Sequence, residues 1–362
     1  MNQWVGPGVP SHGPQGAGHQ SRSELGQLMA SEMAEQPERL SALLARRAEI
    51  GKQVRALVPT DLAGTVLVAR GSSDHAATCG AYFLEMASGR PVASTSPSIF
   101  TLYRALTDFT GYLLIAVSQS GKTPEIVEVV DQARARGARS IAITNDPESP
   151  LAGAADLVVS LDAGNERAVP ATKTVTAQLA AFAIIAQAMG DLGLGDAEAA
   201  ELPGHVAALL ADPGPAIAMA EWLVGADRLV TVARGLLYGA AKEAALKIEE
   251  TTSRFTAAFS AADLRHGPIA IASNGPPVLA FAHPGPASDD VADVVAELRA
   301  RGARTRMAGP VAGSDLSWSA ATPEVLAPIL AVVRGQQLAL ELARLLGRDP
   351  DAPPGLTKVT IT

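Results

Sequence analysis

The sequence predicts an α/β protein built from two tandem copies of one unit. Residues 134–139 read RARGAR, and the same hexapeptide recurs 165 positions later at residues 299–304. The tetrapeptide VARG occurs at residues 68–71 and recurs 164 positions later at residues 232–235. Two matched segments at nearly one offset indicate duplication of a whole unit. In both copies apolar strands alternate with polar turns and helices, which is typical of βαβ units with a parallel sheet.

The composition provides a large apolar core and argues against several classes of function. The 362 residues suffice for two domains, and 48% of them are hydrophobic. The net charge of −8 makes a nucleic-acid surface unexpected, and the single cysteine, Cys79, excludes an internal disulfide or a cysteine metal cluster. We find no stretch of about 18 apolar residues that would span a membrane and no secretory signal. A cytoplasmic protein is therefore expected.

The first half of the chain is expected to contain a leader, a helical segment and the first α/β domain. Residues 1–24 are rich in Gly, Pro, Ser and His and should be disordered, and residues 25–58 should be helical with a break or kink at Pro37. The first domain is assigned to residues 59–190. Its strands are expected at residues 64–69, 111–117, 140–144 and 156–160, and its helices at residues 72–86, 124–136 and 172–189.

The second half is expected to contain a connector, the second α/β domain and a tail. Residues 191–222 are assigned to a helical connector, residues 223–346 to the second domain and residues 347–362 to a tail whose apolar end should pack against the protein. Thr322 and Pro323 should open the last long helix, which Pro328 could kink. The other elements of the second half are expected at residues 192–212 (helix), 228–233 (strand), 238–251 (helix), 277–282 (strand) and 289–301 (helix).

One polar turn of the first copy has the composition of an anion site. Residues 118–123 read SQSGKT between a strand and a helix, so three hydroxyls and the free N–H groups of a helix start converge there. Ser72 and Ser73 follow the neighbouring strand at the edge where open parallel sheets bind ligands. A phosphate monoester fits this chemistry, and a plain helix cap is the alternative. The matching residues 283–288 read HPGPAS, so the second copy has lost this row of hydroxyls.

The second copy instead carries residues that can move protons. Lys247 and Glu250 are three positions apart and share one face of a helix that Ala244 and Ile248 make apolar. A buried carboxylate near a lysine can have a pKa suited to proton transfer, whereas a surface ion pair is the alternative. His266 lies in a Gly-Pro loop, and a structural role is its alternative. Enolisation at such a site needs no metal when a buried base and polarising donors are present.

Taken together, these motifs resemble the sugar isomerase (SIS) domain family. The chain is most similar to the isomerase half of glucosamine-6-phosphate synthase and to stand-alone glucosamine-6-phosphate deaminases of the SIS type. The resemblance covers about residues 30–362. It implies two tandem SIS domains, each a flavodoxin-like parallel sheet flanked by helices in an α-β-α sandwich. The motifs are EQP (35–37), RGSS (70–73), SQSGKT (118–123), AGNERAVPATKTVTAQ (163–178), KEAALKIEE (242–250), DLRHGP (263–268) and LTKVT (356–360).

The resemblance implies roles for individual residues. Glu250 would be the base that moves a proton between C1 and C2, and Lys247 would assist at the sugar oxygens. His266 would open the sugar ring, reaching into the site of the neighbouring subunit. Lys358 would be the tail lysine that closes over the substrate, so the tail would close the active site. The residues expected to bind the sugar and its phosphate are Ser72, Ser73, Ser118, Gln119, Ser120, Thr123, Val169 and Ala171.

The function implied is that of an aminosugar-6-phosphate deaminase/isomerase. It would convert glucosamine 6-phosphate to fructose 6-phosphate and ammonia, with no cofactor. Its partners would be a phosphorylated aminosugar or keto sugar and a second copy of the chain, in a homodimer with the active site at the subunit interface. Neither nucleic acid nor membrane is expected as a partner.

Departures from the family pattern bear on which sugar is used. Asp263 stands where Glu is frequent, Ala257 stands where an acidic residue is frequent, and Ala171 replaces a serine that contacts substrate in the synthase. Glu166 and Lys173 flank the loop with Val169 and could line the site or serve the structure. With no glutaminase domain expected upstream, the chain should not take ammonia from glutamine itself. Two alternatives stay open: a fructosamine-6-phosphate deglycase and a non-catalytic sugar-phosphate sensor.

Overall fold

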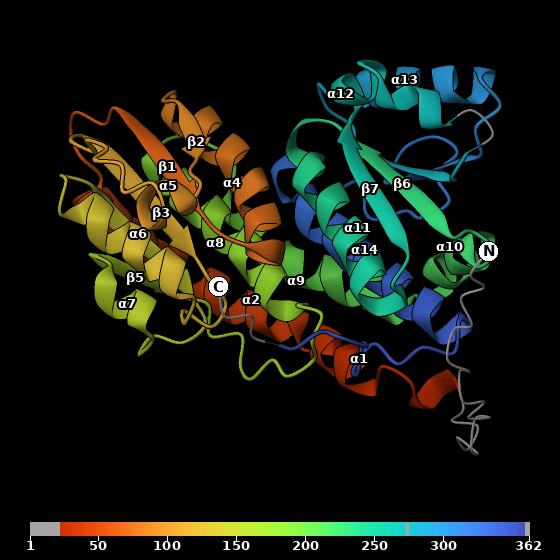
Figure 1. Cartoon of the computed structure of the whole chain (residues 1–362). Coiled ribbons are helices and arrows are strands. Elements are labelled where there is room, and N and C mark those ends of the chain that lie inside the picture. Colours follow the sequence, from red (N-terminus) through yellow and green to blue (C-terminus); the bar gives the residue numbers. More distant parts are fainter. Residues whose placement is uncertain (1–21, 273–274, 359–362) are drawn as a thin grey trace, which may run out of the picture.

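Two α/β lobes lie side by side in the computed structural model of the chain (Figure 1). The structure describes residues 22–272 and 275–358. The N-terminal helices run beneath the lobes, and the tail returns from the second lobe along the same side. Each lobe contains one parallel sheet covered by helices, so the predicted fold class is confirmed.

The first sheet has five parallel strands in the order β2-β1-β3-β4-β5. Flavodoxin-like folds share this order, and they bind ligands where the order reverses, between β1 and β3. The central strands are apolar and buried because helices cover both faces of the sheet. The strands are β1 (Gly64–Val68), β2 (Val92–Ser94), β3 (Tyr112–Val117), β4 (Arg139–Thr144) and β5 (Leu157–Ser160).

The helices before and within the first lobe follow the predicted pattern with several short additions. The N-terminal segment is broken at Glu35, and Pro37 lies in the first turn of the helix that follows the break. The predicted leader ends in a short 3₁₀ helix (Arg22–Glu24), whereas residues 1–21 lie outside the described residues. The α-helices are α1 (Gln27–Ala34), α2 (Gln36–Ala45), α3 (Arg47–Leu57), α4 (Gly71–Ser88), α5 (Ser98–Thr101), α6 (Pro124–Arg134), α7 (Pro150–Ala154) and α8 (Lys173–Met189).

The second sheet repeats the order of the first with one strand fewer. Its order is β7-β6-β8-β9, and all the pairings are parallel. A single parallel bridge between Ala308 and Leu316 lies beside β9, where the first sheet has its fifth strand. The strands are β6 (Arg228–Ala233), β7 (Phe255–Ser260), β8 (Val278–Phe281) and β9 (Thr305–Ala308).

The helices of the second half include one correction to the sequence prediction. The last long helix begins at Ala327 rather than at Thr322, after a 3₁₀ helix (Glu324–Leu326). Pro328 therefore lies in its first turn, where the missing N–H is not needed, and it does not kink the helix. The α-helices are α9 (Asp196–Ala211), α10 (Gly214–Leu223), α11 (Tyr238–Thr252), α12 (Ala261–Arg265), α13 (Ser288–Ala300) and α14 (Ala327–Leu345), with further 3₁₀ helices at Gly235–Leu237 and Pro268–Ala272.

The last helix is long, apolar and largely buried. The segment Glu324–Leu345 is long and apolar enough to cross a membrane by length and composition alone, contrary to the sequence analysis. However, 94% of its most apolar stretch is buried inside the protein, where α14 packs against α10 and α11. Its composition is therefore accounted for by packing in the core.

An ion pair repeated in both lobes supports the duplication. Arg70 follows β1 and pairs with Glu125 in the first turn of α6, at 2.9 Å. Arg234 follows β6 and pairs with Asp290 in the first turn of α13, at 3.3 Å. These partners are separated by the same two offsets as the repeated peptides, so each pair joins equivalent points of its lobe.

The two lobes meet where α4 packs on α11. Gly239 of α11 faces α4 so closely that a Cβ atom there would collide with the backbone oxygen of His75 and lie 2.5 Å from Cys79 Sγ. Burial raises the pKa of the Cys79 thiol to about 12, which suits a packing residue. The close approach of the helices places α11 beside the carboxyl edge of the first sheet.

Candidate active site

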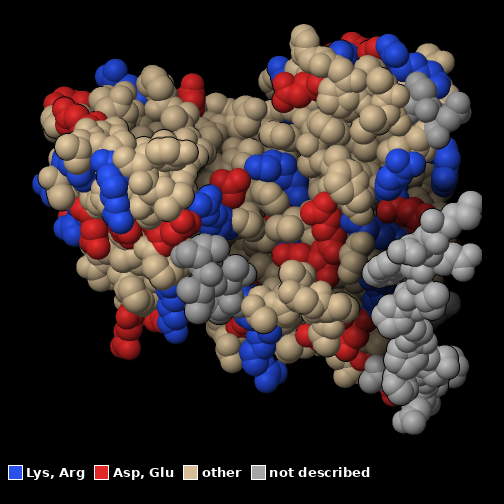
Figure 2. Space-filling view, in the orientation of Figure 1, with Lys and Arg blue, Asp and Glu red and all other residues tan. Residues whose placement is uncertain are grey.

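A pocket of about 350 Å³ opens at the carboxyl edge of the first sheet, and both lobes and the tail contribute to it. The furrow between the lobes is visible in Figure 2, with basic and acidic side chains close together near its lower end. Glu250 and Lys358 line the pocket. The residues expected to bind substrate line it as well: Ser72, Ser73, Ser118, Gln119, Ser120, Thr123, Val169 and Ala171.

The turn between β3 and α6 is shaped to present hydroxyl groups. Ser118 Oγ accepts a hydrogen bond from the Gly121 backbone N at 3.2 Å, and Ser120 Oγ accepts one from the Lys122 N at 3.3 Å. The Thr123 side chain does not cap α6. Since both serine oxygens act as acceptors within the turn, their O–H protons are available to an anion at the start of the helix.

Ser72 and Ser73 face the same pocket from the first turn of α4. Ser72 Oγ accepts a hydrogen bond from Lys247 Nζ, and Ser73 Oγ accepts one from Gln178 Nε2, both at 3.0 Å. Ser73 therefore keeps its own O–H proton for another acceptor, whereas the Ser72 side chain also stabilises the ionised carboxylate of Glu243. Gln178 lies on the buried helix α8, so the first lobe orients Ser73 from behind the pocket.

Lys247 lies directly behind Glu250 and is completely buried. Its ammonium group contacts Glu250 Oε2, and it forms an ion pair with Glu243 Oε1 at 3.3 Å. Burial alone would lower the pKa of Lys247, but the carboxylates of Glu243 and Glu250 raise it above its usual value, so the lysine stays charged. The predicted Lys247–Glu250 pair is thus part of a triad with Glu243.

The two carboxylates of this triad differ in their surroundings. Burial alone would raise the pKa of Glu243, but Lys247 and His75 hold it below its usual value. Burial raises the pKa of Glu250, the charge of Glu243 raises it further, and Lys247 offsets only part of the rise. The Glu250 side chain is 20% exposed, and it lines the pocket. A carboxylate with a raised pKa at a pocket wall is suited to take up and return a proton.

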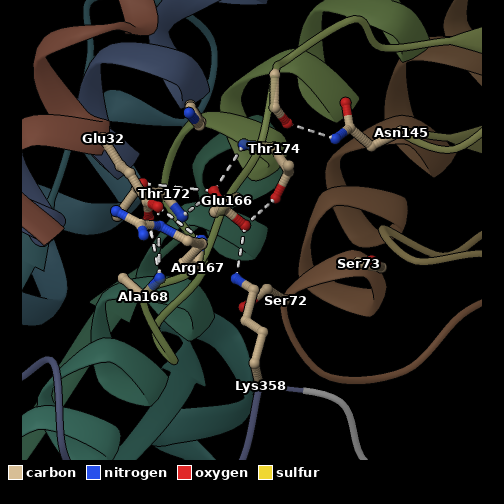
Figure 3. A network of polar contacts seen from close by, with 12 residues as sticks. Glu32, Ser72, Ser73, Asn145, Glu166, Arg167, Ala168, Thr172, Thr174 and Lys358 are labelled. Atoms are coloured by element: carbon tan, nitrogen blue, oxygen red, sulfur yellow. Dashed lines mark hydrogen bonds and ion pairs between the residues drawn. The ribbon is translucent and has the colours of Figure 1, made fainter. Parts of the chain in front are cut away.

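The tail brings a second lysine to the pocket (Figure 3). Lys358 Nζ donates a hydrogen bond to Glu166 Oε2 at 2.7 Å. The Glu166 carboxylate also accepts hydrogen bonds from the backbone N of Thr172 and from the hydroxyl of Thr174. Burial alone would raise the pKa of Glu166, but Lys358 and these donors lower it. Residues 359–362, the end of the predicted tail, lie outside the described residues.

The N-terminal helices brace the loop that carries Val169 and Ala171. The Glu32 carboxylate accepts a hydrogen bond from the backbone N of Arg167 at 2.6 Å (Figure 3). Glu35 pairs at 2.8 Å with Lys173, which is buried at the start of α8. Of the two residues flanking this loop, Glu166 pairs with Lys358 and Lys173 pairs with Glu35. Neither the Glu166 nor the Lys173 side chain lines the pocket.

His266 does not join the other predicted residues within one chain. It is exposed, it directly follows α12, and it does not line the pocket. The family resemblance implies that this residue serves a neighbouring subunit, and its position at the surface is compatible with that expectation.

The corresponding turn of the second lobe is closed. His283 is buried, and its Nδ1 accepts a hydrogen bond from Trp318 Nε1 at 3.2 Å. Asp289 and Asp290 occupy the first turn of α13, where their charges disfavour a bound anion. Across the described ranges, no cluster of three His, Cys, Asp or Glu side chains is placed to hold a metal ion.

Sequence reasoning missed three polar residues that contact the predicted site residues: Glu243, Gln178 and His75. Glu243 lies four positions before Lys247 and seven before Glu250 on one helix, a spacing that could have revealed the triad. No comparable signal marks Gln178 or His75, because each acts on a residue of a distant segment.

The turn at residues 118–123, where a phosphate is expected and which we call the phosphate turn, contains a glycine that provides a test of this geometry. Gly121 has φ +62°, and a Cβ atom there would collide with Ser149 Oγ. We expect Gly121→Ala to weaken binding of inorganic phosphate by about tenfold or more, because a left-handed backbone costs a non-glycine residue about 1–2 kcal/mol and the turn must shift. Isothermal titration calorimetry measures the affinity. Gly153→Ala, which meets no atom within 4 Å, is the matched control. Unchanged affinity in Gly121→Ala would contradict the assignment of the turn.

Comparison with protein-family models matches the chain to the SIS domain over residues 65–188 and 223–316. Among curated proteins, the glutamine–fructose-6-phosphate aminotransferase [isomerizing] of Symbiobacterium thermophilum is 31% identical, over 94% of this chain and 60% of that protein. The same-named protein of Aeropyrum pernix is 34% identical, over 94% of this chain and 58% of that protein. The chain thus spans about three-fifths of the length of these relatives.

Solved structures show the same fold. A Silicibacter pomeroyi protein, provisionally named a phosphosugar isomerase, has a TM-score of 0.80 and 33% identity, covering 90% of this chain and 99% of that one. The C-terminal domain of glucosamine-fructose-6-phosphate aminotransferase from Francisella tularensis has a TM-score of 0.79 and 25% identity, covering 92% and 100%. Glucosamine-6-phosphate deaminase from Thermotoga maritima has a TM-score of 0.75 at 23% identity, covering 93% and 100%, which is a likeness of fold.

Proposed function

The chain belongs to the SIS domain family, and on that premise we propose that it is an aminosugar-6-phosphate deaminase/isomerase. The proposed reaction converts glucosamine 6-phosphate and water to fructose 6-phosphate and ammonia. The observation that carries the proposal is the pocket in which the SQSGKT turn of one lobe faces Glu250 of the other. A phosphate held at that turn would present the sugar carbons to a carboxylate with a raised pKa.

The proposed path uses residues in the order in which the sugar changes. His266 of a second subunit assists opening of the ring. Glu250 removes the proton from C2 and returns it to C1 through an enolamine, which converts the C2–N bond to an imine. Lys358, which lines the pocket, stabilises negative charge on the sugar oxygens during the transfer, and Lys247, buried behind Glu250, stabilises the carboxylate of that base. Water then adds to C2, and the C2–N bond breaks to leave a ketone and release ammonia.

A panel of substrates tests this proposal. Ammonia release and ketose formation would be measured with glucosamine 6-phosphate, galactosamine 6-phosphate, fructosamine 6-phosphates bearing an amino acid on nitrogen, and unphosphorylated glucosamine and galactosamine. We expect the 6-phosphorylated hexosamines to react and the unphosphorylated sugars to fail, because the phosphate turn supplies most of the binding. Release of an amino acid from the fructosamines alone would identify a deglycase. Binding without turnover across the panel would identify a sensor and overturn the proposal.

Mixed dimers test the proposed sharing of His266 between subunits. Glu250→Gln and His266→Ala chains should each be inactive, because each lacks one proton-transfer group in every site. A mixed dimer would contain one site with both groups intact, so we expect up to about half of the wild-type activity per dimer. Activity would be measured on dimers purified with two different affinity tags. An inactive mixed dimer would show that His266 acts within its own subunit, whereas an active His266→Ala chain would remove His266 from the mechanism.

A further inference from the structure

The first turn of α4 makes a contact with the second lobe that the proposed reaction does not use. His75 Nδ1 lies 2.8 Å from Glu243 Oε2, across the junction between the lobes. We propose that His75 is a positioning residue: it holds Glu243 so that Lys247 is shared between two carboxylates, which keeps Glu250 able to accept and return a proton. This inference rests on the proposed function, in which Glu250 is the base.

The ionisation state of Glu243 determines which residue donates the hydrogen bond between His75 and Glu243. Glu243 is 1% exposed, and Lys247, His75 and Ser72 stabilise its ionised form. A carboxylate can only accept hydrogen bonds, so His75 Nδ1 must carry the proton and donate it. The contact between Lys247 and Glu243 Oε1 is an ion pair at 3.3 Å without hydrogen-bond geometry. His75 therefore supplies a directional bond that orients this buried carboxylate.

The charge balance explains why this orientation matters for Glu250. The triad holds two carboxylates and one ammonium group, so Lys247 neutralises neither carboxylate completely. If Glu243 lost its charge, Lys247 would serve Glu250 alone and favour its ionised form. Glu250 would then become a weaker base. Removing His75 should have this effect, because a buried carboxylate without its donor binds a proton more readily.

Few other charged groups act on this triad. Lys358 approaches Glu250 from the tail, and it is unchanged in the variants proposed below. Beside His75 on α4, Asp74 pairs with Lys242 of α11 at 3.2 Å. That ion pair joins the same two helices but has no contact with Lys247 or Glu250 among those found in the described structure. Asp74→Asn is therefore a matched control for a general loosening of the junction.

The variants separate the hydrogen bond from the bulk of the ring. His75→Leu removes the donor and largely fills the space, and His75→Ala removes both. His75→Asn places an amide N–H near the position of Nδ1 and should restore the bond. We expect the acid limb of kcat/KM against pH to move about one pH unit lower in His75→Leu and His75→Ala, as in Glu243→Gln, while His75→Asn and Asp74→Asn keep the wild-type midpoint. KM should change less than twofold, because the phosphate turn is untouched.

A titration of the ligand-free protein tests the role of His75 without an activity measurement. Carboxyl groups labelled with ¹³C would be followed by NMR, and Glu250 would be assigned by its absence from Glu250→Gln. The proposal predicts a lower midpoint for Glu250 in His75→Leu or His75→Ala and a wild-type midpoint in His75→Asn. An unchanged or raised midpoint in the folded His75→Ala protein, or a shift of the same size in Asp74→Asn, would overturn it. A wild-type chain inactive on every sugar phosphate would refute the proposed function alone, since the titration still decides the role of His75.

Discussion

Glu250→Gln should lower kcat by about 10²-fold or more, the range measured for loss of a general base. The substitution preserves the size of the side chain but removes its ability to accept a proton. Glu250 has a raised pKa and lines the pocket. Among the described residues, no other carboxylate lines the pocket, so none can replace it. Steady-state kinetics with glucosamine 6-phosphate, or with the best substrate of the panel, measures the loss.

The control for this variant lies on the same helix. Glu249 is half-buried, and its Oε1 accepts a hydrogen bond from the backbone N of Thr256 at 3.2 Å, away from the triad. Glu249→Gln should therefore retain turnover near that of the wild type. Binding of inorganic phosphate should be the same in both variants, because the proposed phosphate contacts lie in the other lobe. Turnover near that of the wild type in Glu250→Gln would remove Glu250 from the mechanism.

Lys358→Met should abolish measurable turnover and also destabilise the fold. The variant removes an ammonium group that lines the pocket and leaves the buried Glu166 carboxylate without its charged partner. Loss of a hydrogen bond to a charged group costs about 1.5–3 kcal/mol. Kinetics and chemical denaturation measure the two effects. Lys52→Met, at an exposed position of α3, controls for the loss of one lysine.

The stability effect should depend on pH in a defined direction. The folded protein lowers the pKa of Glu166, so the pair stabilises the protein above the unfolded carboxyl pKa of about 4.3. That stabilisation is lost as the pH falls through the lowered pKa of the folded state. The difference in unfolding free energy between wild type and Lys358→Met should therefore be largest near neutral pH and shrink below about pH 4. Equal stability at neutral pH, or an active protein lacking residues 355–362, would argue against a closing role for the tail.

The sequence predicted the central elements of both lobes better than their edges. Strands β1, β3 and β4 are runs of apolar residues because helices bury both of their faces. Strands β2 (VAS), β7 (FTAAFS) and β9 (TRMA) were not predicted. All three lie at sheet edges and contain exposed or half-exposed positions, so they carry no continuous apolar signal.

The site was predictable where its residues share one turn or one helix. The SQSGKT turn and the Lys247–Glu250 spacing are local patterns whose geometry follows from the chain itself. The contacts of Gln178 with Ser73 and of His75 with Glu243 span 105 and 168 positions, so their pairing depends on how the lobes pack. The position of His266 outside the pocket likewise could not be derived from its motif.

The transfer of hydrogen between C2 and C1 tests most directly whether the two lobes form one active site. Glucosamine 6-phosphate carrying deuterium at C2 would be converted in ordinary water, and the ketose product would be analysed by NMR and mass spectrometry. The account predicts deuterium at C1 of the product, diluted by exchange with water at Glu250, and no conversion by Glu250→Gln despite normal phosphate binding. Ammonia release that leaves an aldose with all deuterium still at C2, or transfer that persists in Glu250→Gln, would contradict it.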